Sequence, residues 1–138
     1  MRNELTIIPL PDARLVPRYL LEQVKDRDWD VDEWYAYQAK LQGHVENLVL
    51  GLVDKDHQIK GMVWVTVDGF SKWLFINTFT VDKKYQRMSK LIKFVKRYIK
   101  DLSIKLGIKR ALWAARRTKA LERYGFKCSE YQLMEHQF

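Results

Sequence analysis

The residues of this 138-residue sequence that could do chemistry are mainly basic, and they gather in one segment. Residues 83–123 contain 15 Lys and Arg and two acids, whereas residues 1–82 contain 9 Lys and Arg and 13 Asp and Glu. The net charge of +8 therefore combines a strongly basic third of the chain with a mildly acidic remainder. Such an asymmetry attracts anionic partners over long distances. The candidates are nucleotide phosphates, nucleic acid and an acidic protein face.

Residues for nucleophilic or metal chemistry are few. Cys128 is the single cysteine, so it cannot form an internal disulfide, and no Cys or His neighbour stands at the spacing of a zinc site. We expect it to be a small packing residue, and we expect no metal site. The single cysteine and the lack of a signal-peptide pattern favour a reducing, cytoplasmic compartment. No apolar run reaches the roughly 18 residues of a membrane span, so we expect no membrane partner.

Ten predicted elements position these residues, in the order β-α-α-β-β-β-α-β-α-β. The strands are predicted over residues 5–10, 48–53, 59–67, 73–81, 108–115 and 128–138. The first helix is predicted to hold Pro17 in its first turn and to end near residue 25, and the second to run from Asp30 to Gly43. Two more helices are predicted over residues 87–106 and 118–124. The sequence has no linker or repeat, which predicts a single domain over residues 1–138.

The helix over residues 87–106 has the strongest periodic signal. Its apolar residues recur at helical spacing, among them Leu91, Val95 and Ile99, and Gly107 follows as a cap. A strand, a long helix and a short apolar strand make a crossover in which the two strands lie parallel. The fold class is therefore α/β (α+β), with a central mixed sheet that is mostly antiparallel.

Two short stretches connect this order of elements to a known family. Residues 79–87 read Phe-Thr-Val-Asp-Lys-Lys-Tyr-Gln-Arg and lead from the fourth strand into the long helix. Residues 121–126 read Leu-Glu-Arg-Tyr-Gly-Phe and are similar to the Tyr-x-x-x-Gly-Phe ending of that family's last helix. With the order of elements, they resemble the GNAT superfamily of acetyl-CoA-dependent N-acetyltransferases over nearly the whole chain.

The resemblance implies a place for acetyl-CoA. The fourth and fifth strands would separate after a bulge, and the acyl thioester would lie between them with its carbonyl polarised by strand N–H groups. The pyrophosphate would lie on the following loop and helix N-terminus, where unpaired N–H groups and the helix dipole favour anions. The implied cofactor-binding residues are Phe79, Thr80, Val81, Gln86, Arg87, Met88, Ser89 and Lys90.

The resemblance also implies a primary amine substrate, which loses a proton to a base and attacks the thioester. The second helix borders the acceptor site in this family, so Trp34 is expected to contact the amine together with Asn77 and Thr78 of the fourth strand. None of these three side chains is a base at neutral pH. Tyr124, one residue before Gly125, is the candidate catalytic acid that reprotonates the leaving thiolate.

Four positions depart from the family pattern. When the family motif Q/R-x-x-G-x-G/A is aligned on Gln86, its two glycine positions hold Ser89 and Leu91. Ser89 is small and can bond a phosphate, whereas the branched Leu91 either narrows the phosphate site or turns into the core. Ala114 stands where Asn is common near the end of the fifth strand, and Leu121 stands at the tyrosine position of the last helix.

The sequence therefore leaves three functions open. The first is an acyl-CoA-dependent N-acetyltransferase with an unidentified amine substrate. The second is a catalytically degenerate GNAT-like structural or binding protein, such as a phage virion-associated protein, which would act in the virion and form a homo-oligomer or a stable complex. The third is a nucleic-acid-associated protein that uses residues 83–123, a segment that would equally suit an acidic protein.

Overall fold

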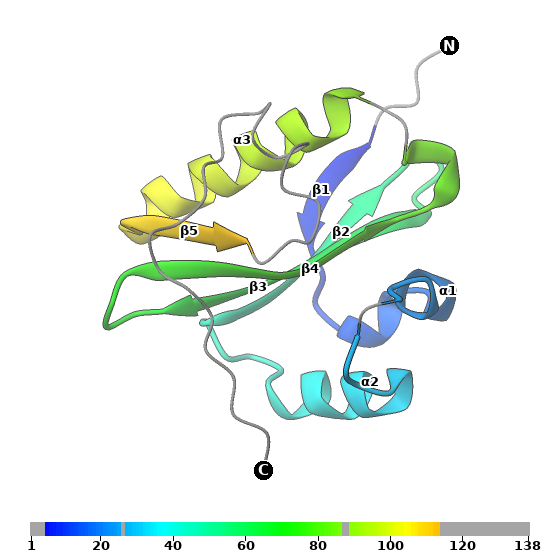
Figure 1. Cartoon of the computed structure of the whole chain (residues 1–138), viewed down its shortest axis with the longest axis horizontal. Coiled ribbons are helices and arrows are strands. Elements are labelled where there is room, and N and C mark those ends of the chain that lie inside the picture. The colour runs from blue at the N-terminus through cyan, green and yellow to red at the C-terminus, as the bar shows by residue number, and fades with distance from the viewer. Residues whose placement is uncertain (1–4, 26, 87–88, 114–138) are drawn as a thin grey trace.

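The computed structural model of the chain describes residues 5–25, 27–86 and 89–113 (Figure 1). These residues form a five-stranded sheet with the strand order β1-β2-β3-β4-β5. The strands are β1 (Thr6–Pro9), β2 (Asn47–Val53), β3 (Ile59–Asp68), β4 (Trp73–Val81) and β5 (Arg110–Trp113). The helices are α1 (Arg18–Glu22), α2 (Val31–Lys40) and α3 (Ser89–Leu106), with short 3-10 turns η1 (Ala13–Leu15) and η2 (Lys83–Tyr85). None of the helices in this part of the chain is long and apolar enough to cross a bilayer.

The predicted sheet topology is confirmed. Strands β1 to β4 pair antiparallel in sequence order, and β5 pairs parallel to β4 from Trp73↔Arg110 to Ile76↔Trp113. The parallel pair follows from the crossover through α3, because the helix returns the chain to the end of the sheet at which β4 begins. The bounds of β4 agree with the prediction at both ends. The helix and strand predicted over residues 118–124 and 128–138 lie outside the described residues.

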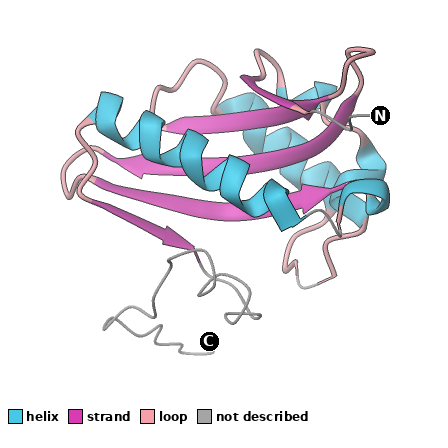
Figure 2. Ribbon diagram, turned by 90° about the horizontal axis from the view of Figure 1, so that it is seen from above, coloured by secondary structure: helices cyan, strands magenta, loops and turns pink. Residues whose placement is uncertain are grey.

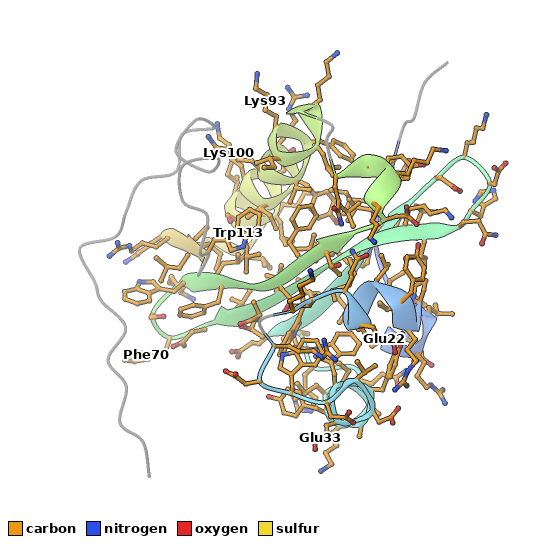
Figure 3. The ribbon with its side chains drawn as sticks, turned by 45° about the vertical axis from the view of Figure 1, so that its right-hand side comes forward. Glu22, Glu33, Phe70, Lys93, Lys100 and Trp113 are labelled. Carbon is orange, nitrogen blue, oxygen red and sulfur yellow. The ribbon has the colours of Figure 1, made fainter. Side chains whose placement is uncertain are left out.

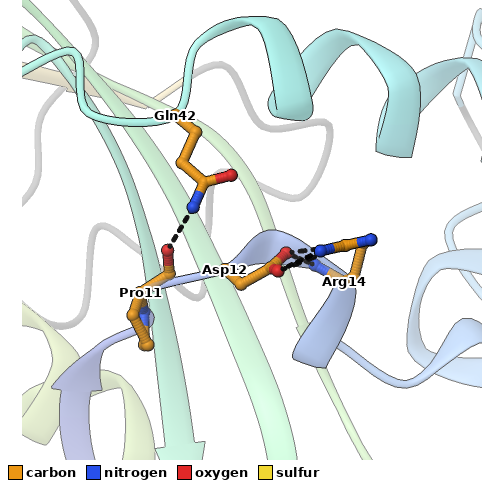
Figure 4. Close-up of polar contacts among 4 residues, drawn as sticks. All are labelled: Pro11, Asp12, Arg14 and Gln42. Atoms are coloured by element: carbon orange, nitrogen blue, oxygen red, sulfur yellow. Dashed lines mark hydrogen bonds and ion pairs between the residues drawn. The ribbon is translucent and has the colours of Figure 1, made fainter.

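The first helix is shorter than predicted. Pro17 occupies the N-cap of α1 with an extended backbone instead of lying within the first turn, and the helix ends after five residues. The chain before it is organised by Asp12, whose carboxylate accepts the Arg14 backbone N–H at 2.9 Å and caps η1 (Figure 4). Gln42 donates its side-chain amide to the Pro11 carbonyl at 3.3 Å (Figure 4). The chain between β1 and α1 therefore forms a separate 3-10 turn instead of leading directly into the helix.

Alternation along the strands builds two cores, one on each face of the sheet. Helix α3 covers one face, while α1 and α2 cover the other (Figures 1 and 2). On β3, Val63 and Val65 belong to the core beneath α3, and Met62 lies in the core beneath α1 and α2. The α3 side contributes Leu91, Val95 and Ile99, and the other side contributes Leu20, Leu21, Val31 and Trp34. Burying each of these side chains stabilises the fold by about 1.5–3 kcal/mol.

A partly buried hydrogen-bond relay joins α2 to the sheet. The Trp64 indole N–H donates to Asn47 Oδ1 at 2.8 Å, and Asn47 Nδ2 donates to Gln38 Oε1 at 2.8 Å. The indole can only donate, so it fixes the orientation of the Asn47 amide, which in turn fixes that of Gln38. The relay does not use Gln38 Nε2, which is buried. Trp34 Nε1, one helical turn earlier, is also buried. Neither of these two donors has a hydrogen-bond partner among the described residues.

We expect Asn47→Ala to lower the free energy of unfolding by about 2–4 kcal/mol, because it leaves Trp64 Nε1 and Gln38 Oε1 without partners. The matched control is Asn77→Ala, which removes an exposed amide that donates to Thr66 Oγ1 and should change stability by less than about 0.5 kcal/mol. Urea unfolding of both variants measures the difference. Equal losses would show that the relay does not stabilise the packing of α2.

Candidate functional site

A β-bulge in β4 is the central feature of the candidate site. Trp64 pairs with Thr78 while Val65 pairs with Ile76, so Asn77 is an extra residue on β4. Asn77 donates to Thr66, which lies two residues from Trp64 and so on the same face of β3. The bulge therefore presents the consecutive side chains of Asn77 and Thr78 on the face that carries α1 and α2.

Beyond the bulge, the main-chain groups of two β4 residues point away from β3. Asp82 donates its backbone N–H to the Lys60 carbonyl at 2.7 Å, so alternation directs the main-chain groups of Phe79 and Val81 to the opposite edge. That edge faces the side on which β5 lies, and the described β4–β5 pairing ends at Ile76↔Trp113. Among the described residues, no strand pairs with this stretch of the edge. Its main-chain donors are therefore not paired with any described strand.

The carbonyl at the end of this edge is already used. The Val81 carbonyl oxygen accepts the side-chain amides of Gln23 at 2.6 Å and of Gln86 at 3.0 Å. These bonds satisfy the acceptor and hold the chain where it leaves the sheet. The N–H groups of Phe79 and Val81 point to the same edge, and they suit an electron-rich ligand atom such as a carbonyl oxygen.

Helix α1 anchors the end of β4. Thr80 Oγ1 donates to the Leu20 carbonyl at 2.8 Å and accepts the Gln23 side-chain amide at 2.7 Å. Tyr19 donates its hydroxyl to Asp82 Oδ2 at 2.7 Å. Thr80 thus positions β4 against α1, and its side chain points away from the edge that Phe79 and Val81 share.

Asp82 shapes the turn after β4. Its carboxylate accepts the Lys84 backbone N–H at 3.0 Å and caps η2. This bond, followed by the Tyr19 hydroxyl, holds the pKa of Asp82 below its ordinary value. Burial, and then the bond to Asp82, raises the pKa of Tyr19 to about 12. Tyr19 therefore keeps its proton near neutral pH and cannot serve there as a general base.

The turn delivers the chain to the N-terminus of α3. The first turn of α3 contains no acid and carries the exposed Lys90, while Lys83 and Lys84 are exposed just before it. Leu91 is 6% exposed and belongs to the core beneath α3. Of the two alternatives for Leu91, the structure therefore shows the second, in which the side chain turns into the core.

Aromatic residues line the α2 side of the bulge. Trp64, the cross-strand partner of Thr78, makes edge contacts with Trp34 at 6.2 Å and with Tyr37 at 6.3 Å between ring centroids. Trp34 is 2% exposed, so it supports Trp64 from beneath, whereas Tyr37 is 52% exposed. Tyr37 is thus the most accessible aromatic of this group, and the sequence interpretation did not include it.

The structure brings part of the predicted site together. Asn77, Thr78, Phe79, Thr80 and Val81 lie in sequence on β4, and Gln86 bonds back to its end. Lys90 follows on the first turn of α3. Arg87, Met88 and Tyr124 lie outside the described residues, as does the side chain of Ser89. Gln23 was missed because its role depends on a contact 57 residues away in the sequence, which no local pattern indicates.

The side chains at the bulge are polar, but they do not ionise near neutral pH. Asn77 and Thr78 can donate and accept hydrogen bonds, and neither gains or loses a proton near neutral pH. The described site therefore offers main-chain donors at the β4 edge, an anion-favouring helix N-terminus and an aromatic wall.

This chain resembles known proteins in its fold and not in its sequence. No protein-family model and no curated protein matches the sequence. An aminoglycoside N-acetyltransferase, AAC(6')-Iy, solved in complex with CoA, has a TM-score of 0.78 at 13% identity, covering 99% of this chain and 97% of that one. A GNAT family acetyltransferase of Staphylococcus aureus has a TM-score of 0.72 at 12% identity, covering 97% and 99%. Glucosamine-6-phosphate N-acetyltransferase of Arabidopsis thaliana has a TM-score of 0.71 at 17% identity, covering 96% and 97%.

These similarities extend over nearly the full length of each chain, and they agree with the mixed α+β architecture of the described residues. The protein has the fold of the GNAT acetyltransferases.

Proposed function

We propose that this protein is a GNAT-family N-acyltransferase that binds an acyl-CoA such as acetyl-CoA and acylates a primary amine. The observation that carries the proposal is the edge of β4 after the Asn77 bulge, with the N–H groups of Phe79 and Val81 directed away from β3. This edge leads within a few residues to the N-terminus of an 18-residue helix. Similar folds include an acetyltransferase solved with a bisubstrate analogue that contains CoA.

The described residues fit coenzyme A in three respects. The β4 edge offers N–H donors beyond its last pair with β5, and these suit amide and thioester carbonyl oxygens. The N-terminus of α3 has no acid in its first turn, and its dipole favours phosphate. Leu91, the branched residue at a glycine position of the family motif, is buried and does not occupy the space at the helix N-terminus.

Each part of the site has a distinct role in this proposal. A bound acyl-CoA supplies the acyl group as an activated thioester. The N–H groups of Phe79 and Val81 orient and polarise its carbonyl, in the manner of an oxyanion hole. Lys83, Lys84 and Lys90 hold the phosphates by charge.

The acceptor amine belongs on the other side of the bulge, beside Asn77 and Thr78. Tyr37 and Trp64 form a wall there on which an ammonium group or a sugar ring can pack. Neither Asn77 nor Thr78 can take up the amine proton, so water receives it or the amine enters already neutral. The proposed role of Tyr124 as the acid that reprotonates the thiolate stays a prediction.

The first test is isothermal titration of the full chain with acetyl-CoA and with free CoA at low and moderate salt. We expect micromolar affinity that weakens as salt rises, because the proposed phosphate contacts are charge-dependent. Release of free thiol in the presence of an aminoglycoside, glucosamine 6-phosphate or a simple diamine then tests acyl transfer. If neither ligand produces heat at either salt, the coenzyme proposal is wrong.

The charge at the start of α3 can be tested separately. We expect Lys90→Ala to weaken CoA binding by about three- to tenfold, because it removes a cation beside the helix N-terminus. The control Lys105→Ala removes the same charge from the last turn of the same helix, about 22 Å away, and should leave CoA affinity unchanged. Calorimetry on both variants gives the comparison, and equal weakening would place the phosphates elsewhere.

A second function is favoured by the lack of an ionisable side chain at Asn77 and Thr78. The protein would then be a GNAT-like binding or structural protein without catalysis, as in a virion-associated role. Tight binding of CoA with no acyl transfer to any amine in the panel would support this alternative.

A further inference from the structure

The outer face of α3 carries a row of cations that the coenzyme proposal does not use in full. Six Lys and Arg and a single acid, Asp101, occur within Ser89–Leu106. Lys90, Lys93, Arg97 and Lys100 follow one another at spacings of three, four and three residues, which places them within about 80° of the helix circumference. We call these four residues the α3 basic row.

The α3 basic row points away from the sheet. Leu91, Val95 and Ile99 occupy the opposite side of the helix and are buried in the core. Figure 3 shows Lys93 and Lys100 projecting outward from α3, on the opposite side of the molecule from Glu22 and Glu33 of the α1 and α2 layer. Because the core fixes the rotation of α3, the direction of the row is fixed too.

The length and spacing of the row suit a chain of phosphates. Lys90 and Lys100 are separated by about 15 Å along the helix axis, with a cation every 4.5–6 Å or so. Further cations lie near its C-terminal end at Lys105 and Lys109, both exposed.

The composition of the row favours nucleic acid over other anionic surfaces. The cores of protein interfaces are depleted in Lys, whereas three of the four residues in the row are Lys. A helix that lies on a membrane buries an apolar face in the lipid. The apolar face of α3 is already buried against the sheet, so it is not available for that purpose.

We propose that the α3 basic row binds the phosphate backbone of nucleic acid, without reading its sequence. Lys90 lies next to the proposed coenzyme phosphates, but Arg97 and Lys100 lie two or more turns further along the helix. The nucleic-acid surface therefore extends beyond the coenzyme site, and the two can be separated by mutation.

The test measures fluorescence anisotropy of a labelled DNA duplex of about 20 base pairs with the full chain, between about 50 mM and about 200 mM salt. Four phosphate contacts predict that the affinity falls on the order of 100-fold over this range. Arg97→Ala/Lys100→Ala should weaken binding at the lower salt by at least about tenfold and reduce the log–log salt slope by about 2. Thermal unfolding and CoA titration of the same variant should match the wild type.

The matched control is Lys40→Ala/Lys55→Ala, which removes two charges from exposed positions outside α3 and should retain full DNA affinity. Equal weakening in both double variants would mean attraction by net charge alone and would overturn the proposal. Absence of binding at the lower salt would also overturn it. Competition by poly-glutamate as effective as by DNA would assign the row to an acidic protein, and binding confined to anionic vesicles would assign it to lipid.

Discussion

The hydrogen-bonding requirement of the β4 main chain is the constraint on which the candidate site depends. From Trp73 to Ile76, β4 is paired on both edges, with β3 and with β5. At Asn77 the bulge adds one residue, and the described pairing with β5 stops beside it. Buried N–H and C=O groups are rarely left unpaired in proteins. The Gln23 and Gln86 amides meet this requirement for the Val81 carbonyl, and the proposed function assigns the N–H groups on the same edge to a ligand.

The two faces of the sheet also differ in charge. Ion pairs in the first third of the chain join Arg14 to Asp12, and Arg18 to Glu22 and Asp32. Helix α3 lies across the sheet from them and has little opposing acid of its own (Figure 3). The helix dipole acts mainly within the first turn, whereas side-chain charges act along the whole helix. One helix can therefore offer a local anion site at its start and a longer polyanion surface on its outer face.

Sequence reasoning predicted the sheet well because its signals are local. Asp68-Gly69 and Asp82 bound β4, and the run from Ser89 to Leu106 repeats every three to four residues. A bulge was expected only through the family resemblance and without a position, since its place at Asn77 arises from a mismatch with β3 that neither strand shows alone. The hydrogen bonds that hold β4 against α1, and the ring contact between Tyr37 and Trp64, join segments that are distant in the sequence. No local pattern could predict them.

Leu91 shows how local periodicity can be more informative than a family motif. Aligned with the motif, it replaces a glycine that would let a phosphate approach the backbone. Read as part of the helix, it begins the series that continues with Val95 and Ile99, spaced by four residues. A side chain in that series must face the sheet, and burying it contributes about 1.5–3 kcal/mol. The substitution therefore adds to the core, while the anion-favouring groups at the helix start are main-chain N–H groups that any residue except proline provides.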